Sequence, residues 1–271
     1  MKRLCIHTAT TKPWSTEQCI ERYSRAGVNG ITFWRYNLDG RAPADVGRQA
    51  RDAGLDIVSL CRGGFFPASS PAERQKAIDD NRLCIEQAHE LGAPLIVLVC
   101  GAVPGQPLSE SRQQITDGIA AVLPDAEAAG IKLAIEPLHP MYADDRSAVN
   151  TMRQAHEICD ALKSPDHLGI AVDVYHVWWD PHLRAEIELA ALKRRLFAFH
   201  ICDWKTPTTD LLNDRGLMGE GCIPIREISD WVDATGFSGP REVEIFSTRH
   251  WATDQDEYLG KITAAYDKLY A

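Results

Sequence analysis

The chain has 271 residues, of which 45% are hydrophobic and 25% charged, and its formal net charge is −9. These values are typical of a globular protein, and the length suits one α/β barrel. The acidic charge disfavours nucleic-acid binding because phosphates would be repelled. No apolar run reaches the roughly 18 residues of a membrane span, and the N-terminus lacks the apolar core of a signal peptide. We therefore expect a cytoplasmic protein without a nucleic-acid or membrane partner.

The eight cysteines are scattered along the chain, and none belongs to a C-x-x-C pair. Disulfide-rich secreted proteins and structural zinc sites use closer, repeated cysteine spacings. The pattern therefore indicates free thiols in a reducing compartment.

Eight short apolar segments predict β-strands. Each is nearly continuous in apolar and β-branched residues, as parallel strands buried on both faces are. In chain order they are 3–8, 30–35, 56–62, 93–99, 131–137, 168–174, 196–201 and 242–247.

Amphipathic segments between these strands predict helices. Ser15 and Gln18 have the spacing of a capping box, which starts a helix that runs to about residue 26. Asn150 is expected to cap a later helix. Glycines at 27, 54, 92 and 130 follow helical segments and predict left-handed C-caps. The remaining helices are expected over 72–91, 109–129, 151–162, 182–194, 224–235 and 254–270.

The alternation of eight strands with helices predicts a (β/α)8 TIM barrel that forms a single domain over residues 1–271. An open doubly wound sheet is the competing arrangement. It usually has fewer strands and, in a nucleotide binder, a glycine-rich first turn. The turn after the first predicted strand, TATTKPWS, contains no glycine, which favours the barrel.

Polar side chains end the last four predicted strands, where a barrel places its active site. They are Glu136, Asp173, His200 and Glu244. Any one of them alone is more often a helix cap, an ion-pair partner or a core histidine. Four on successive strands predict a metal site, because a dication would relieve the repulsion among three carboxylates. Oxygen ligands with one imidazole favour Mn²⁺ first, with Mg²⁺, Co²⁺ and Zn²⁺ left open.

The motifs at these strand ends resemble those of the xylose isomerase-like barrel superfamily. Within it, they are similar to the sugar isomerase and epimerase branch, which contains ketose 3-epimerases, hydroxypyruvate isomerases and inosose dehydratases. The resemblance covers the whole chain, in order and in length. The motifs are E-P at 136–137, D-V-Y-H at 173–176, F-H-I-C-D at 199–203 and E-V-E at 242–244.

The resemblance implies that Glu136, Asp173, His200 and Glu244 are the metal ligands, that the two glutamates are the acid/base pair, and that His176 contacts a substrate oxygen. The implied activity is removal of a proton next to a carbonyl group through a metal-stabilised enediolate. Proton return to the same carbon gives epimerisation, and return to the neighbouring carbon gives isomerisation. Loss of a β-substituent instead gives elimination.

The chain departs from the ketose 3-epimerase pattern after the seventh strand. Those enzymes carry an arginine there, whereas this chain has Lys205 and Thr206, and Arg215 is the nearest replacement. This departure keeps open a metal-dependent lyase or dehydratase that acts on a keto-sugar or inosose. A metal-dependent hydrolase or endonuclease is less favoured, since endonuclease IV uses more histidines and several metals. A non-catalytic sugar-binding barrel is a further alternative.

Several other side chains are candidates for the site. His7, Trp34 and Arg62 end early strands and are expected to contact substrate. A core hydrogen bond is an equal alternative for His7, and pairing with a local acid is a slightly favoured alternative for Arg62. Asp203 and Glu220 are expected to support the metal ligands, but Asp203 could equally cap a turn.

The segment 205–221 is the longest irregular stretch near the predicted site, so we expect it to close over the substrate. The chain shows no glycine-rich phosphate cradle, which favours an unphosphorylated sugar or polyol as the small-molecule substrate. A homo-oligomer is left open.

Overall fold

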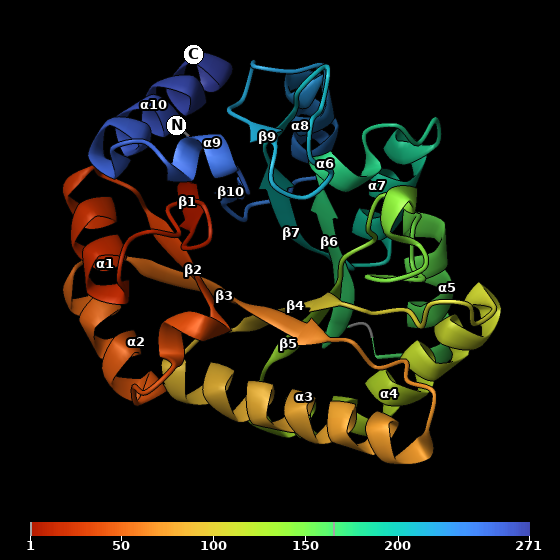
Figure 1. The fold of residues 1–271 in the computed structure, drawn as a ribbon. Coiled ribbons are helices and arrows are strands. Elements are labelled where there is room, and N and C mark those ends of the chain that lie inside the picture. Colours follow the sequence, from red (N-terminus) through yellow and green to blue (C-terminus); the bar gives the residue numbers. More distant parts are fainter. Residues whose placement is uncertain (1, 165) are drawn as a thin grey trace.

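The computed structural model describes residues 2–164 and 166–271, and within them eight parallel strands close into a barrel (Figure 1). The strands pair around the barrel in the order β1-β10-β7-β6-β5-β4-β3-β2, which confirms the predicted TIM barrel. Their bounds are β1 Leu4–His7, β2 Gly30–Trp34, β3 Asp56–Gly64, β4 Leu95–Val99, β5 Lys132–Ile135, β6 Leu168–Asp173, β7 Leu196–Ile201 and β10 Arg241–Val243.

Helices surround the barrel and cover the outer faces of its strands (Figure 1). The long ones are α1 Thr16–Arg25, α2 Pro43–Asp52, α3 Pro71–Leu91, α4 Leu108–Ala129, α5 Met152–Leu162, α7 Leu183–Leu192, α8 Ile225–Ala234 and α10 Gln255–Tyr270. Single turns form α6 Val174–Val177 and α9 Thr248–Trp251, and 3₁₀ turns form η1 Arg35–Leu38 and η2 Pro140–Tyr142. No helix among the described residues is long and apolar enough to cross a membrane.

The predicted helix caps are confirmed with one exception. Ser15 and Gln18 form both bonds of the capping box, and the glycines at 27, 54, 92 and 130 all have positive φ. The prediction that Asn150 caps α5 is wrong. Thr151 is the cap, because its side chain accepts from the amide of Gln154. The Asn150 amide instead donates to the carbonyl groups of Leu138 and Ser147 and so ties together the loop before α5.

Small residues inside the barrel leave room for the polar side chains above them. Ala134, Ala171 and Ala198 pack in one buried cluster within the barrel. Each lies two residues before Glu136, Asp173 or His200 respectively, and alternate strand residues face the same side. The strands therefore carry an inward-facing acid or imidazole one layer above each alanine.

A two-stranded antiparallel ribbon follows the seventh barrel strand. It pairs β8 Asp203–Trp204 with β9 Arg215–Gly216. The segment 205–214 is thus a loop closed at its base by this ribbon, and Arg215 returns to the barrel at its end.

Candidate metal centre

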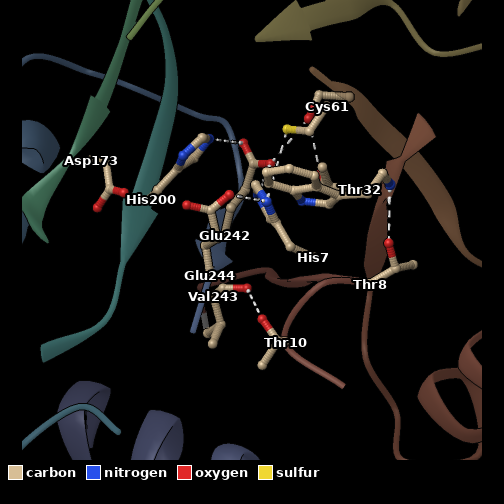
Figure 2. A network of polar contacts seen from close by, with 12 residues as sticks. His7, Thr8, Thr10, Thr32, Cys61, Asp173, His200, Glu242, Val243 and Glu244 are labelled. Carbon is tan, nitrogen blue, oxygen red and sulfur yellow. Dashed lines mark hydrogen bonds and ion pairs between the residues drawn. The ribbon is translucent and has the colours of Figure 1, made fainter. Parts of the chain in front are cut away.

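The four predicted ligand residues converge at the C-terminal ends of their strands. Figure 2 shows three of them, Asp173, His200 and Glu244. Glu136 directly follows β5, Asp173 ends β6, His200 lies on β7 and Glu244 directly follows β10. One donor atom from each of these residues lies within 4.8 Å of those of the others, and all four side chains are buried. Pairing of β6 with β7 sets Asp173 opposite His200. The geometry predicted from the strand ends is therefore present.

This donor set fits one divalent cation. Burial raises the pKa of Asp173 to about 7, although the nearby guanidinium of Arg215 opposes the rise. A dication among the carboxylates would offset this cost of burying negative charge. His200 Nδ1 lies 3.0 Å from Glu136 Oε1, whereas its Nε2 faces Glu242 Oε1 at 3.8 Å. Nδ1 is therefore the ring nitrogen that can join the carboxylates as a ligand.

Arg215 reaches the cluster from the loop that follows β7. Its Nη1 donates to Asp173 Oδ2 at 3.1 Å and to Glu244 Oε2 at 2.9 Å, and its Nη2 lies 3.2 Å from His176 Nε2. The guanidinium also lies 4.3 Å from the ring centroid of Tyr175. Arg215 thus neutralises part of the carboxylate charge and fixes His176 beside the cluster.

His7 lies against two carboxylates of β10 and its extension (Figure 2). Its Nε2 is 3.1 Å from Glu242 Oε2, and its Nδ1 is 2.9 Å from Glu244 Oε1. Burial lowers the pKa of His7, but Glu244 and Glu242 outweigh burial and raise it to about 10. Both ring nitrogens are engaged and the side chain is fully buried. These contacts do not match the expected role of His7 in binding substrate. They match the alternative expectation, that His7 makes a hydrogen bond in the core.

Glu242 is a functional candidate that sequence reasoning missed. It accepts from the hydroxyl group of Thr32 at 2.7 Å and lies between the rings of His7 and His200. The signal was present in the E-V-E motif, since Glu242 and Glu244 are two residues apart and face the same side. Glu242 thus contacts His7, which also contacts Glu244, and it faces His200, which belongs to the cluster.

A cavity of about 150 Å³ opens beside the cluster and includes Glu136 and Glu244 in its walls. Other wall residues are four that the sequence predicted to contact substrate, Trp34, Arg62, His176 and Arg215. A larger cavity of about 870 Å³ lies at the opposite end of the barrel, around residues such as Arg3 and Lys132. None of the four candidate ligands lines the larger cavity. The smaller cavity is therefore the candidate substrate site.

The loop 205–214 reaches this cavity. Leu212 forms part of the cavity wall, and the carbonyl of Leu211 accepts hydrogen bonds from the hydroxyl groups of Tyr142 and Tyr175. The tip of this loop therefore borders the cavity, and its closure over a substrate stays a prediction.

Asp203 and Glu220 hold the chain that flanks this loop and do not contact the candidate ligands. The carboxylate of Asp203 accepts from the backbone amides of residues 204, 219, 221 and 223 at 2.8–3.0 Å. Asp203 therefore has the second of its two expected roles, a turn cap. Glu220 accepts from the amide of Leu217 and pairs with Arg249. Neither of these partners is a candidate metal ligand, so Glu220 does not have the expected supporting role.

A sequence profile of the family described as "Xylose isomerase-like TIM barrel" matches residues 20–264. The chain belongs to this family. The resemblance first noted in the strand-end motifs is thereby confirmed.

Individual similar proteins show how far the likeness extends. An inosose isomerase from Halalkalibacterium halodurans is 25% identical over 199 residues, which are 72% of this chain and 68% of that protein. The crystal structure of protein SMc04130 from Sinorhizobium meliloti 1021 is 45% identical, with a TM-score of 0.94 and 98% of each chain covered. An IolI protein crystallised with zinc is 22% identical, with a TM-score of 0.84 and coverages of 99% and 98%.

Proposed function

We propose that this protein is a divalent-metal-dependent sugar isomerase or epimerase that moves a proton on a carbon next to a carbonyl group. The proposal rests on one observation above all. Glu136 and Glu244 belong to the four-residue cluster and also line the cavity beside it. Membership of a family with sugar isomerases supports the same activity.

The cation held by Glu136, Asp173, His200 and Glu244 would stabilise the negative charge that develops on substrate oxygens when the proton leaves. We propose Mn²⁺, because three carboxylates and one imidazole form an oxygen-rich set. Zn²⁺ is the main competitor, since the IolI structure contains it.

The two glutamates are held in different ways, which suits an acid/base pair. Glu136 Oε1 contacts His200, and no described residue donates a hydrogen bond to Glu136 Oε2. Glu136 Oε2 can therefore accept a proton from a substrate in the cavity. Burial raises the pKa of Glu244, but His7 and Arg215 outweigh burial and hold it well below its ordinary value. Glu244 is thus an ionised group at the other side of the substrate.

His176 and Arg215 would orient the substrate, because both line the cavity and hold each other at 3.2 Å. A lyase or dehydratase remains the alternative. The segment in which ketose 3-epimerases carry an arginine after the seventh strand has Lys205 and Thr206 here, and Lys205 pairs with Asp214. Arg215 is the nearest replacement. Net loss of water, instead of reversible exchange, would identify this alternative.

Incubation of the metal-loaded protein with keto-sugars and inososes in deuterated water tests the proposal. The wild type should incorporate deuterium at the reacting carbon, and chelation should stop the exchange. Glu136→Gln and Glu244→Gln should each slow the exchange by about 10²–10⁴-fold, the usual contribution of a positioned acid or base. Metal content by elemental analysis shows whether each variant still holds the cation.

Glu90→Gln is the matched control, because Glu90 is exposed on α3 and should leave exchange unchanged. Normal exchange in a metal-loaded Glu136→Gln protein would remove Glu136 from the proton-transfer role. Undiminished exchange after complete chelation would contradict the metal dependence.

A further inference from the structure

Two arginine side chains in the cavity wall have no acidic partner. Arg62 and Arg146 both line the cavity beside the carboxylate cluster, and both are half-buried. Among the described residues, no carboxylate oxygen lies within 4.0 Å of either guanidinium, and neither side chain makes a hydrogen bond. Since their nitrogens are not sealed from solvent, the donors remain available to a ligand.

Aromatic rings hold these guanidinium groups without using their N–H donors. The guanidinium carbon of Arg62 lies 4.0 Å from the ring centroid of Phe65, and that of Arg146 lies 5.7 Å from the ring centroid of Tyr142. Stacking of this kind orients a guanidinium and leaves its five N–H groups free at the edge. Burial and the neighbouring Arg146 lower the pKa of Arg62.

Arg35, which lies near Arg62, is an arginine with a structural role and serves for comparison. Arg35 lines the adjoining cavity of about 450 Å³, which shares Trp34 and Arg62 with the first. Its guanidinium forms a two-pronged pair with Asp80, with N–O distances of 2.7 and 2.9 Å. Arg62 and Arg146 lack such a pair although acids outnumber bases in the chain, 38 to 29.

The charges of the cluster balance without these two arginines. Glu136, Asp173 and Glu244 carry three negative charges, and Arg215 with a bound dication would supply three positive charges. Glu242 is balanced separately by His7, whose pKa is raised to about 10. Arg62 and Arg146 are then a surplus of two positive charges in a partly buried cavity. Partial burial of an unpaired cation costs free energy unless an anion pairs with it.

We propose that the substrate carries an oxyanion group, a carboxylate or a phosphate monoester, which Arg62 and Arg146 bind while its carbonyl end faces Glu136 and Glu244. Arginine pairs with both groups through parallel N–H···O bonds. This inference rests on the proposed function and departs from the neutral, unphosphorylated sugar favoured by the sequence.

Calorimetric titration of the metal-loaded protein with three six-carbon ketoses tests the inference. D-Fructose is neutral, D-fructose 6-phosphate carries a phosphate at C6, and D-fructuronate carries a carboxylate at C6, so the two anionic arms distinguish the sources. At least one anionic compound should bind about tenfold or more tightly than D-fructose, as expected for hydrogen bonds to a charged group. Inorganic phosphate is a further probe and should compete with that compound.

The Arg62→Met/Arg146→Met protein should lose this preference, whereas Arg62→Lys should keep part of it because the charge remains. Arg184→Met is the matched control, since Arg184 is exposed on α7 and pairs with Glu188. If the double variant fails to fold, Arg146→Met alone should still reduce the preference.

Equal affinity for all three compounds would overturn the inference. So would an anion preference that survives in the double variant, or failure of phosphate and both anionic compounds to bind at millimolar concentration. These outcomes are independent of turnover. Absence of deuterium exchange would count against the isomerase proposal, while the binding data would still decide whether the wall recognises an oxyanion.

Discussion

The two sides of the candidate cavity differ in how their charged side chains are paired. The half from β5 to β10 contains the carboxylate cluster, and each of its charges faces an opposite one, as Arg215 faces Asp173 and Glu244. The half from β1 to β4 and the loop after β5 supply cavity walls in which Arg62 and Arg146 have no acidic partner within the described chain. The carboxylate side is arranged to hold a cation. The other side presents two guanidinium groups, unpaired among the residues described, that can pair with an anionic ligand.

Methionine in place of one arginine from each half should separate these roles most clearly. Arg215→Met leaves two buried carboxylates without their partner, so the free energy of unfolding of the metal-free protein should fall by about 3–5 kcal/mol. Arg62→Met breaks no ion pair and should change it by less than about 1 kcal/mol. Urea denaturation of both proteins measures the difference.

Metal should restore part of the stability lost in Arg215→Met, because the cation also neutralises Asp173 and Glu244. Equal losses in the two variants would mean that Arg62 has a structural partner as costly to remove as those of Arg215, and the contrast between the halves would disappear.

Glu242→Gln should have a smaller effect on the cation site. The amide keeps the size of the side chain but removes the charge that faces His7 and His200. Loss of such outer partners typically weakens metal binding by about 10–100-fold. Competition with a chelator measures the metal affinity, and circular dichroism checks the fold. An unchanged affinity would limit Glu242 to core packing.

The smallest effect should come from an ion pair on the outer surface of the β1–β4 half. Arg41 donates to both carboxylate oxygens of Glu17 and lowers the pKa of Glu17 from 4.5 to about 2. In Arg41→Gln this pKa should rise toward 4.5, as NMR titration can measure. The pair stabilises the fold above the unfolded pKa of 4.5, and this contribution is lost as pH falls toward about 2. A pKa that stays near 2 would assign the shift to the helix N-terminus.

Sequence reasoning located the elements and residues whose signals are local. Eight apolar runs gave the barrel strands, and glycines such as Gly92 and Gly130 marked helix ends by their left-handed backbone. Strand ends brought Glu136, Asp173, His200 and Glu244 together, since adjacent parallel strands end at one edge. The start of α2 was missed because Ala42 provides no side-chain cap.

Features that depend on packing could not be predicted in the same way. Arg146 lies in an irregular loop between η2 and α5, where no periodicity shows which way a side chain points. Arg215 was singled out as a substrate residue, but its contact with two carboxylates depends on how the ribbon of β8 and β9 returns to the barrel. His7 was ambiguous because its partners come from β10, more than 230 residues away.

The turn around Asp203 limits how the cavity can exchange its contents with solvent. Four backbone amides converge on this carboxylate and anchor the chain on both sides of Arg215. The tip near Leu211 is held from outside the loop by two tyrosine hydroxyl groups on its carbonyl, while Asp210 and Asp214 brace the loop from within. If the cavity opens to small molecules, we expect the movement at this tip, with the guanidinium of Arg215 remaining beside the carboxylates.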